Sequence, residues 1–281
     1  MPWADTGVSA AAAAPGSFGV VGLGRMARAL VLPLIEAGVL DPARLRASVA
    51  SEASARALSQ AHDLPVSTDA GAAWGCATVL LAVKPQQLEA AAAAAPAVAV
   101  AAGEAPLLIS VLAGVTLERL ERLFPGHRCV RSVPNTPCLV RAGLTGLAWG
   151  QGVDGGRREW VRGLFARVGE VLELPESQLD AFLALTSSGP AFLALVAEAL
   201  ADGAVAAGLP RLQAHHLAHR TLAGTAALLQ EQDLHPGQLK DMVSSPGGTT
   251  IAGLRQLEKA GVRSALIEAV VAAAARSREL A

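Results

Sequence analysis

The sequence lacks tyrosine altogether and has only three cysteines, Cys76, Cys129 and Cys138, among its 281 residues. An odd number of cysteines, none of them in C-x-x-C spacing, argues against a disulfide framework. Few, scattered cysteines are typical of a reducing compartment, where they behave as small buried hydrophobic residues. We therefore expect a cytoplasmic protein with free, buried thiols.

An excess of positive charge is also missing. The formal net charge is −1, and no run of lysine and arginine is interleaved with aromatic residues, so a nucleic-acid partner is not expected. The alanine-rich stretch 90–102 contains Pro96 and falls short of the roughly 20 strongly apolar residues that a membrane-spanning helix needs. Residues 1–17 have neither a positively charged start nor a leucine-rich core. We interpret them as a loose leader and expect no signal peptide and no membrane partner.

What the sequence does contain is enough apolar residues, 52% against 17% charged, for a globular protein, and a length typical of two domains. The first half alternates short, continuously apolar runs with helical patterns. This alternation predicts a parallel sheet with helices on both faces. The predicted strands are 17–22, 44–50, 77–83, 107–113 and 128–133, and the predicted helices are 26–37, 52–62, 85–95 and 117–123.

The second half has a different periodicity. From about Ser177 the apolar residues recur every three or four positions, which predicts helices only. A last short strand meets Pro175 in the segment 171–177, and we place the domain boundary there. The predicted fold class is α/β, with a Rossmann-type parallel-sheet domain over 17–174 and an all-helical domain over 175–281. Because these helices carry few charges and many small apolar residues, we expect a homodimer interface on them.

The run Gly22-Leu23-Gly24-Arg25-Met26-Ala27 follows the first predicted strand and opens a helix. In this G-x-G-x-x-A pattern the first glycine makes a tight turn, and the second lets the backbone approach a pyrophosphate. The small third residue packs the helix on the strand. A plain structural turn is the alternative, but the strand-turn-helix context favours a dinucleotide held at the helix N-terminus.

The end of the second predicted strand bears on which dinucleotide binds. An acidic residue there would hold the ribose hydroxyls of NAD, whereas the sequence has Ser48 and Ser51 with Arg25 or Arg56 near by. Glu52 follows closely. NADPH is therefore the leading cofactor and NADH the alternative, while ordinary loop capping is the other interpretation of the two serines.

Two later loops follow predicted strands at the carboxyl edge of the sheet, where ligands of such folds bind. The first contains Val83, Lys84 and Pro85, and its lysine is either a surface residue or part of the cofactor site. In the second, VPNTP, two prolines fix the backbone around Asn135, which gives either a rigid loop or a loop beside the nicotinamide. The predicted cofactor-binding residues are Gly22, Leu23, Gly24, Arg25, Met26, Ala27, Ser48, Ser51, Val83, Lys84, Pro85 and Asn135.

The most unusual segment, DMVSSPGGTTIAGL at 241–254, places a polar run between helical segments. Gly247 and Gly248 at the start of a helix can point successive N–H groups at an anion, and Thr249 and Thr250 add hydroxyls. Charge-assisted hydrogen bonds contribute about 1.5–3 kcal/mol each, so three or four of them can hold a small acid without an arginine. A helix cap with a tight turn is the alternative explanation.

Six segments in a consistent order resemble pyrroline-5-carboxylate reductases from about Phe18 to Leu280: GLGRMA, AVKPQ, VPNTP, TSSGPAF, EALADGAVAAGLPR and HPGQLKDMVSSPGGTTIAGL. The resemblance implies a Rossmann domain and a helical domain that interleaves with its partner in a homodimer, which in the family is often assembled into decamers. It implies NADPH- or NADH-dependent hydride transfer to the cyclic imine 1-pyrroline-5-carboxylate, giving L-proline. It places the substrate carboxylate at Ser245, Gly247, Gly248, Thr249 and Thr250, with Thr250 and Ser245 as the catalytic residues.

Other functions stay open at this point. One is a reductase for another cyclic imino acid, or a relative of the β-hydroxyacid dehydrogenases, which use a lysine of the helical domain. Lys240 and Lys259 are the only lysines in that half. Another is a dinucleotide-binding sensor without turnover. No metal site is expected: His215, His216 and His219 lack a matching set of carboxylates or cysteines, and we interpret them as a solvated helix face.

Overall fold

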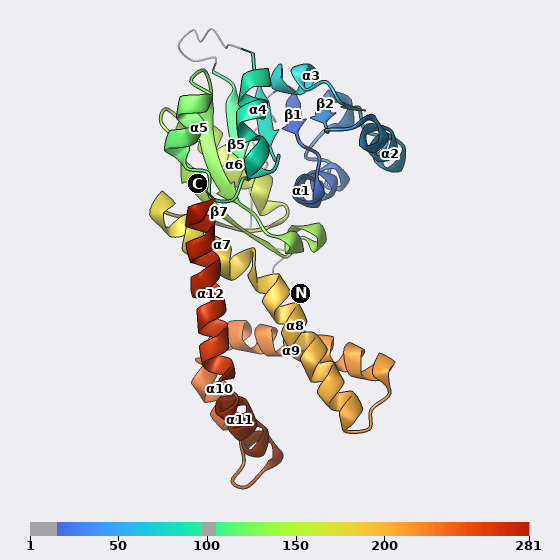
Figure 1. Ribbon diagram of the computed structural model, residues 1–281, viewed down its shortest axis with the longest axis vertical. Helices are drawn as coiled ribbons and strands as arrows, with labels where there is room; N and C mark the ends of the chain where they lie inside the picture. Colours follow the sequence, from blue (N-terminus) through green and yellow to red (C-terminus); the bar gives the residue numbers. More distant parts are fainter. Residues whose placement is uncertain (1–15, 97–104, 281) are drawn as a thin grey trace. The chain divides into compact units, whose positions relative to one another are not determined.

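The first part of the chain forms one mostly parallel sheet (Figure 1). The computed structural model describes residues 16–96 and 105–280, and within these ranges the sheet has eight strands. In spatial order they are β3 (Val66–Ser67), β2 (Leu45–Ser48), β1 (Phe18–Val21), β4 (Thr78–Leu81), β5 (Leu107–Ser110), β6 (Arg128–Val133), β7 (Gly143–Trp149) and β8 (Gly169–Glu173). The strand order reverses between β1 and β4. In doubly wound folds, ligands bind at the carboxyl ends of the strands at such a switch point.

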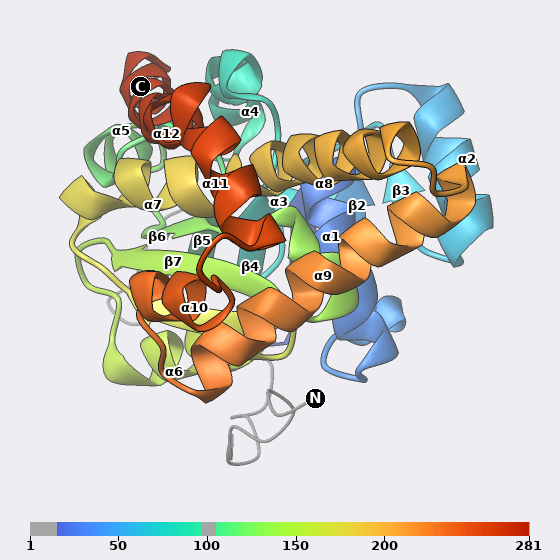
Figure 2. The same ribbon diagram turned by 90° about the horizontal axis from the view of Figure 1, so that it is seen from below.

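Helices cover both faces of this sheet. α1 (Arg25–Glu36) and α6 (Gly155–Ala166) share one hydrophobic core, and Figure 2 shows them on the opposite side of the sheet from α4 and α5. The other face packs against α3 (Gly71–Trp74), α4 (Leu88–Ala94), α5 (Leu117–Leu123) and α7 (Leu179–Thr186). β1, β4 and β5 are buried at every position, as expected of strands with both faces covered. The remaining elements here are α2 (Glu52–His62) and the short 3-10 helices η2 (Pro42–Arg44), η3 (Pro85–Gln87), η4 (Thr136–Val140) and η5 (Glu176–Gln178).

The predicted fold class is confirmed, and most predicted elements lie close to their predicted bounds. Two strands were not predicted from the sequence: β3, which is very short, and β7, which pairs antiparallel with β6. β7 has the sequence GLTGLAW, in which the glycines hide the strand pattern. Gly146 has a packing reason, because a Cβ there would lie 2.9 Å from side-chain atoms of Leu179 and Phe182 on α7. Because β7 runs antiparallel to β6, the sheet is mixed rather than wholly parallel.

The chain divides into two compact units. Unit 1 contains the described residues up to Ser187 and those from Ala273 onward, and unit 2 is Ser188–Ala272. This division comes later in the chain than the predicted boundary at 174–175, because η5 and α7 pack against β6 and β7. Residues 1–15 of the expected leader, and the alanine-rich stretch beyond residue 96, lie outside the described residues.

Unit 2 is built from helices. They are α8 (Gly189–Ala206), α9 (Arg211–Glu231), α10 (Pro236–Met242), α11 (Thr249–Lys259) and the first part of α12 (Val262–Glu279), whose last turns belong to unit 1. α8 and α9 pack through small side chains, with Ala201, Ala214 and Ala218 buried between them. Large apolar side chains elsewhere on these helices are exposed, such as Leu195 at 67% and Leu212 at 84%. A surface this apolar is typical of a protein-protein interface.

One buried histidine in unit 1 lacks hydrogen-bond partners. His127 packs edge-on against the rings of Trp74 and Phe124, with centroid distances of 6.0 Å and 5.9 Å. Within the described part of the chain, neither of its ring nitrogens has a hydrogen-bond partner. Burial lowers the pKa of His127 below its ordinary value of 6.5, because the charged imidazolium is poorly solvated there.

This lowered pKa predicts that acid weakens the fold. Just below pH 6.5 the unfolded chain binds a proton at this histidine and the folded chain does not, so the free energy of unfolding falls as the pH drops through 6.5. His127→Phe, which keeps a ring in the cluster, should remove this part of the pH dependence. Urea unfolding on both sides of that pH measures the effect, with His216→Phe at an exposed histidine as the control. Equal pH dependence in His127→Phe and the wild type would contradict the prediction.

Candidate active site

A tight turn joins β1 to α1. Gly22 has a φ of +95°, and the backbone N–H groups of Gly22 and Leu23 both donate to the carbonyl of Ser48 on β2 at 3.0 Å. A Cβ at Gly22 would lie 2.8 Å from the backbone nitrogen of Val83, so only glycine fits this position. Ala27, the third small residue of the pattern, is fully buried in the core under α1. The fold itself therefore uses the first and third positions of the pattern.

Gly24 has a different place, at the start of α1. It is the N-cap residue with a φ of −81°, and no described atom lies within 4 Å of its Cβ position. Among the described residues no side chain caps this helix end, and the first turn has no acidic residue. The N–H groups of the first turn are thus free, and the helix dipole favours an anion beside them. Open space and free donors together fit the pyrophosphate of a dinucleotide.

The two serines after β2 are placed differently. Ser48 is buried, and its hydroxyl lies 3.5 Å from the carbonyl of Val20, so its side chain faces the interior of the sheet. Ser51 is exposed at the N-cap of α2, where its hydroxyl accepts a hydrogen bond from the backbone of the first turn. The carboxylate of Glu52 accepts a hydrogen bond of 2.6 Å from the hydroxyl of Thr68. Only Ser51 of the two predicted serines therefore offers an exposed hydroxyl.

The loop after β4 and the loop after β6 differ in the exposure of their predicted site residues. Val83 and Lys84 lie between β4 and η3, Pro85 is the first residue of η3, and Lys84 is exposed. Asn135 is buried, and its side-chain amide donates to the carbonyl of Thr186 at 3.0 Å.

The oxygen of the Asn135 side chain is also occupied. It accepts a hydrogen bond of 2.8 Å from the backbone N–H of Leu144. Asn135 thus connects the loop after β6 to β7 and to the end of α7, and both polar atoms of its side chain are hydrogen-bonded within the fold.

The loop between α10 and α11 has the features of an anion site. Gly247 has a φ of +68°, and Gly248 is the N-cap residue of α11, with no side-chain cap in the described part of the chain. The N–H of Gly248 donates to the carbonyl of Ser245 at 3.0 Å, which folds the loop back on itself. A Cβ at Gly248 would collide with the hydroxyl of Ser245. Thr249 and Thr250 open a first turn that has no acidic residue, so its N–H groups are free to bind an anion.

The cysteines and histidines offer no rival chemistry. All three cysteines are buried and free, and burial raises the pKa of Cys129 to about 12, with Glu121 adding to the effect. Burial also raises the pKa of Cys138. Such thiols stay protonated and are poor nucleophiles. In residues 16–96 and 105–280, no group of three or more His, Cys, Asp or Glu side chains could hold a metal ion.

Known proteins resemble this chain along most of its length. The family model of pyrroline-5-carboxylate reductase dimerisation matches residues 176–280, and the model of NADP oxidoreductase, coenzyme F420-dependent, matches residues 17–114. The pyrroline-5-carboxylate reductase of Synechocystis sp. is 45% identical over 265 residues, which are 93% of this chain and 97% of that protein. The chain belongs to the pyrroline-5-carboxylate reductase family. The predicted family is thereby confirmed.

Two further relatives of this reductase family support the assignment. The pyrroline-5-carboxylate reductase of Arabidopsis thaliana is 40% identical over 263 residues, covering 93% of this chain and 94% of that protein. The crystal structure of Plasmodium falciparum pyrroline carboxylate reductase with NADP bound has a TM-score of 0.85 and 28% identity, and covers 94% of this chain and 97% of that one. The whole fold, and not only the glycine turn, is therefore that of the reductase family.

The match to the reductase dimerisation model explains the exposed apolar surface of unit 2. Within the described residues, the stretch Glu176–Ala206 is long and apolar enough to cross a membrane by length and composition, and 17% of its most apolar window is buried inside the structure. The dimerisation region of the family includes this stretch. The match supports homo-oligomerisation, in which a second copy of the chain would cover apolar side chains of this kind.

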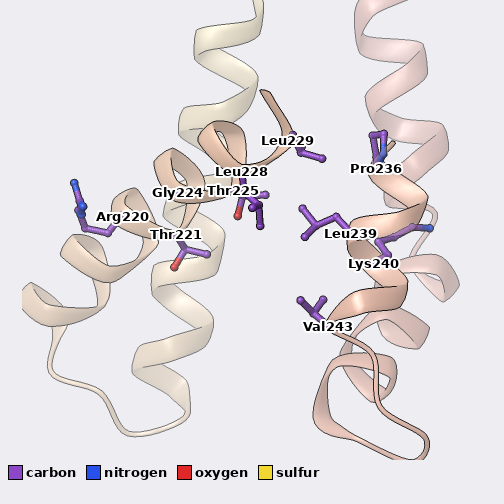
Figure 3. A pocket seen from close by; sticks show the side chains of 10 residues that line it. All are labelled: Arg220, Thr221, Gly224, Thr225, Leu228, Leu229, Pro236, Leu239, Lys240 and Val243. Atoms are coloured by element: carbon purple, nitrogen blue, oxygen red, sulfur yellow. The ribbon is translucent and has the colours of Figure 1, made fainter. Parts of the chain in front are cut away.

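The helical unit of this reductase also contains a cavity of about 650 Å³ between α9 and α10 (Figure 3). Figure 3 shows Leu239 of α10 and Val243, the residue that follows α10, pointing toward α9. The residues that line it are Arg220, Thr221, Gly224, Thr225, Leu228, Leu229, Pro236, Leu239, Lys240 and Val243. Of the described residues that line it, none belongs to the predicted substrate segment 245–250. The leucine-rich lining fits an apolar side chain of a second copy better than a small acid.

Sequence reasoning missed one hydroxyl in the loop between α10 and α11. The Oγ of Ser244 is buried and has no hydrogen-bond partner among the described residues. Buried hydroxyls are nearly always hydrogen-bonded, so an unpaired one suggests an absent partner. Nothing in the sequence distinguishes Ser244 from Ser245, because only the backbone geometry of the loop decides which hydroxyl is buried.

Proposed function

We propose that this reductase converts 1-pyrroline-5-carboxylate to L-proline with NADPH as the hydride source. The reaction, the enzyme class and an NAD(P)H cofactor are confirmed at the level of the family, by relatives of that name at 45% and 40% identity and a solved relative with NADP bound. The observation that carries the proposal is the pair of helix N-termini with free N–H groups, one on α1 and one on α11. A dinucleotide and a carboxylate substrate need two such anion sites.

The residues proposed to hold the cofactor lie at the first of these helix ends. The backbone of Gly24, Arg25 and Met26 would bind the pyrophosphate, with Lys84 and its neighbours at the adjacent strand end. When bound, the cofactor supplies the hydride from its nicotinamide ring. The fold uses Gly22 and Ala27 to bring α1 close enough to the sheet for this arrangement.

The preference for NADPH over NADH is also a proposal. Ser51 is exposed at the start of α2, and Arg25 and Arg56 are exposed cations that could pair with a 2′-phosphate. The acidic residue that could instead favour NAD, Glu52, has its carboxylate hydrogen-bonded to Thr68. A carboxylate engaged in this way is less available to ribose hydroxyls. We therefore rank NADPH first and keep NADH as the alternative.

We propose that the substrate carboxylate binds at the start of α11. The free N–H groups of Thr249 and Thr250 would donate to it, and the hydroxyls of Ser245, on the loop before α11, and of Thr250, in its first turn, would add to them. Holding the acid in register with the cofactor supplies most of the catalysis, because hydride transfer needs the reacting carbons about 3–3.5 Å apart. A protonated imine needs no acid from the protein, and we assign no proton donor.

We further propose that the enzyme works as a homodimer in the cytoplasm, and the family resemblance extends this to decamers built from dimers. The dimerisation match over residues 176–280 and the exposed apolar helices of unit 2 support the dimer. The three buried, free thiols fit a reducing compartment.

The test is the oxidation of NADPH and NADH by the purified protein with 1-pyrroline-5-carboxylate. We expect turnover with both coenzymes, a lower KM for NADPH, and proline as the product. Tight NADPH binding without turnover would instead favour a sensor. Faster turnover with a six-membered cyclic imino acid would favour a reductase of another substrate.

A further inference from the structure

The chain passes between its two units at two places, after Ser187 and after Ala272. Both crossings are held by the same part of unit 1, which is strand β6 and the loop that follows it. The predicted substrate loop, 245–250, lies in the segment between the two crossings.

The first crossing is fastened by two hydrogen bonds at the end of α7. The side-chain amide of Asn135 donates to the carbonyl of Thr186 at 3.0 Å. The hydroxyl of Ser187 donates to the carbonyl of Pro134 at 3.1 Å. Because Pro134 and Asn135 belong to one proline-bracketed loop, these bonds attach the end of α7 to a stiff segment.

The second crossing is fastened through a buried cation. Arg131 on β6 is 2% exposed and forms ion pairs with Glu176 at 3.1 Å and Asp180 at 2.9 Å. The same oxygen of Asp180 accepts a hydrogen bond of 2.8 Å from the hydroxyl of Ser277 near the end of α12. Arg131 therefore connects the sheet, the start of α7 and the last helix of the chain.

The end of α12 is also held by close packing. Gly114, in the loop before α5, has a φ of +76°, and a Cβ there would lie 2.9 Å from the Cβ of Leu280. Glu176, an ion-pair partner of Arg131, accepts a further hydrogen bond of 2.7 Å from the backbone N–H of Leu117, the first residue of α5. The loop before α5 and the network around Arg131 thus meet at the end of α12.

We infer that Ser187 and Ser277 are positioning residues for the reduction, since they fasten the two ends of the segment that carries the substrate loop. The inference rests on the proposed function. A buried ion network of this kind adds little net stability, so its value lies in fixing one geometry. When the chain on either side of that segment is already ordered, less of the chain remains to be ordered as the acid binds, and this raises the affinity for the acid. Neither serine touches substrate or cofactor in this account.

The experiment compares Ser187→Ala, Ser277→Ala and the double variant with the wild type. The matched control is Ser264→Ala, at an exposed serine on the same helix as Ser277. We expect the double variant to raise the KM for the imine by about fivefold or more. The Kd for NADPH should stay at the wild-type value, because the turn at Gly24 is untouched. Hydrogen exchange of residues 273–280 should speed up in Ser277→Ala and not in Ser264→Ala.

Two results would overturn the inference. One is an unchanged imine KM in the double variant, and the other is an equal weakening of NADPH binding, which would indicate general loosening. If the wild type does not reduce the imine at all, the proposed function fails by itself. The role of Ser277 in holding the end of α12 is then tested by hydrogen exchange alone. An exchange rate of residues 273–280 in Ser277→Ala equal to that of the wild type would reject this role.

Discussion

Gly24→Val is expected to abolish NADPH binding while the protein stays folded. The Cβ position of Gly24 meets no described atom within 4 Å, and its φ of −81° is one that valine adopts readily. The added side chain would occupy the space where the backbone must approach the pyrophosphate. Losing two or more charge-assisted hydrogen bonds of about 1.5–3 kcal/mol each lowers kcat/KM by at least about a hundredfold.

Two glycine variants serve as controls for this result. Gly155→Val makes the same change at the start of α6, where the Cβ position is also open, and should leave activity near the wild-type value. Gly22→Val should instead prevent stable folding, because its Cβ would lie 2.8 Å from backbone and its φ is +95°. Thermal unfolding and NADPH titration of the three variants separate the two effects. Wild-type NADPH affinity in Gly24→Val would show that the pyrophosphate lies elsewhere.

Much of the fold could be predicted from the sequence because periodicity records burial. Strands covered on both faces are continuously apolar, and the observed α2 and α5 have the predicted bounds of 52–62 and 117–123. β7 could not be found in this way, because Gly146 allows the close packing of α7, Gly143 allows the close approach of Cys138 and Val168, and neither contributes to an apolar pattern. Apolar patterns along the chain show which face of a helix or strand is buried. A contact between distant helices and strands, in contrast, is marked in the sequence by only a single unusual residue.

Side chains of the candidate site show the same limit. The backbone roles of Gly22 and Gly248 follow from turn geometry, which a short motif encodes. The hydrogen bonds of the Asn135 side chain could not be predicted in this way, because its partners Thr186 and Leu144 are distant in the sequence or unrelated to the motif. Arg131 is one of two arginines in β6, and only the structure shows that it is the buried one and needs buried partners. Its partners, Glu176 and Asp180, are set by the packing of η5 and α7, and the sequence alone does not show this.

Thr249→Glu should raise the KM for the imine strongly while stabilising the protein. Thr249 is the first residue of α11 and is exposed, so a carboxylate there stabilises the helix by about 0.3–1 kcal/mol through its dipole. The same carboxylate would lie within about 4 Å of the bound substrate acid. At that separation two like charges repel by about 4 kcal/mol near a protein surface, so we expect the KM to rise by about a hundredfold or more.

The opposite signs of these two effects make the experiment decisive. A loop that only caps α11 gains stability from Thr249→Glu and loses nothing in catalysis, whereas an anion site gains stability and loses its substrate. Thr249→Gln is the matched control, because glutamine has the size of glutamate without its charge. Its KM should rise far less, and NADPH affinity should stay unchanged in both variants. Equal KM values for the Glu and Gln variants would place the substrate carboxylate away from α11, because a negative charge at the start of that helix would then have no effect on substrate binding.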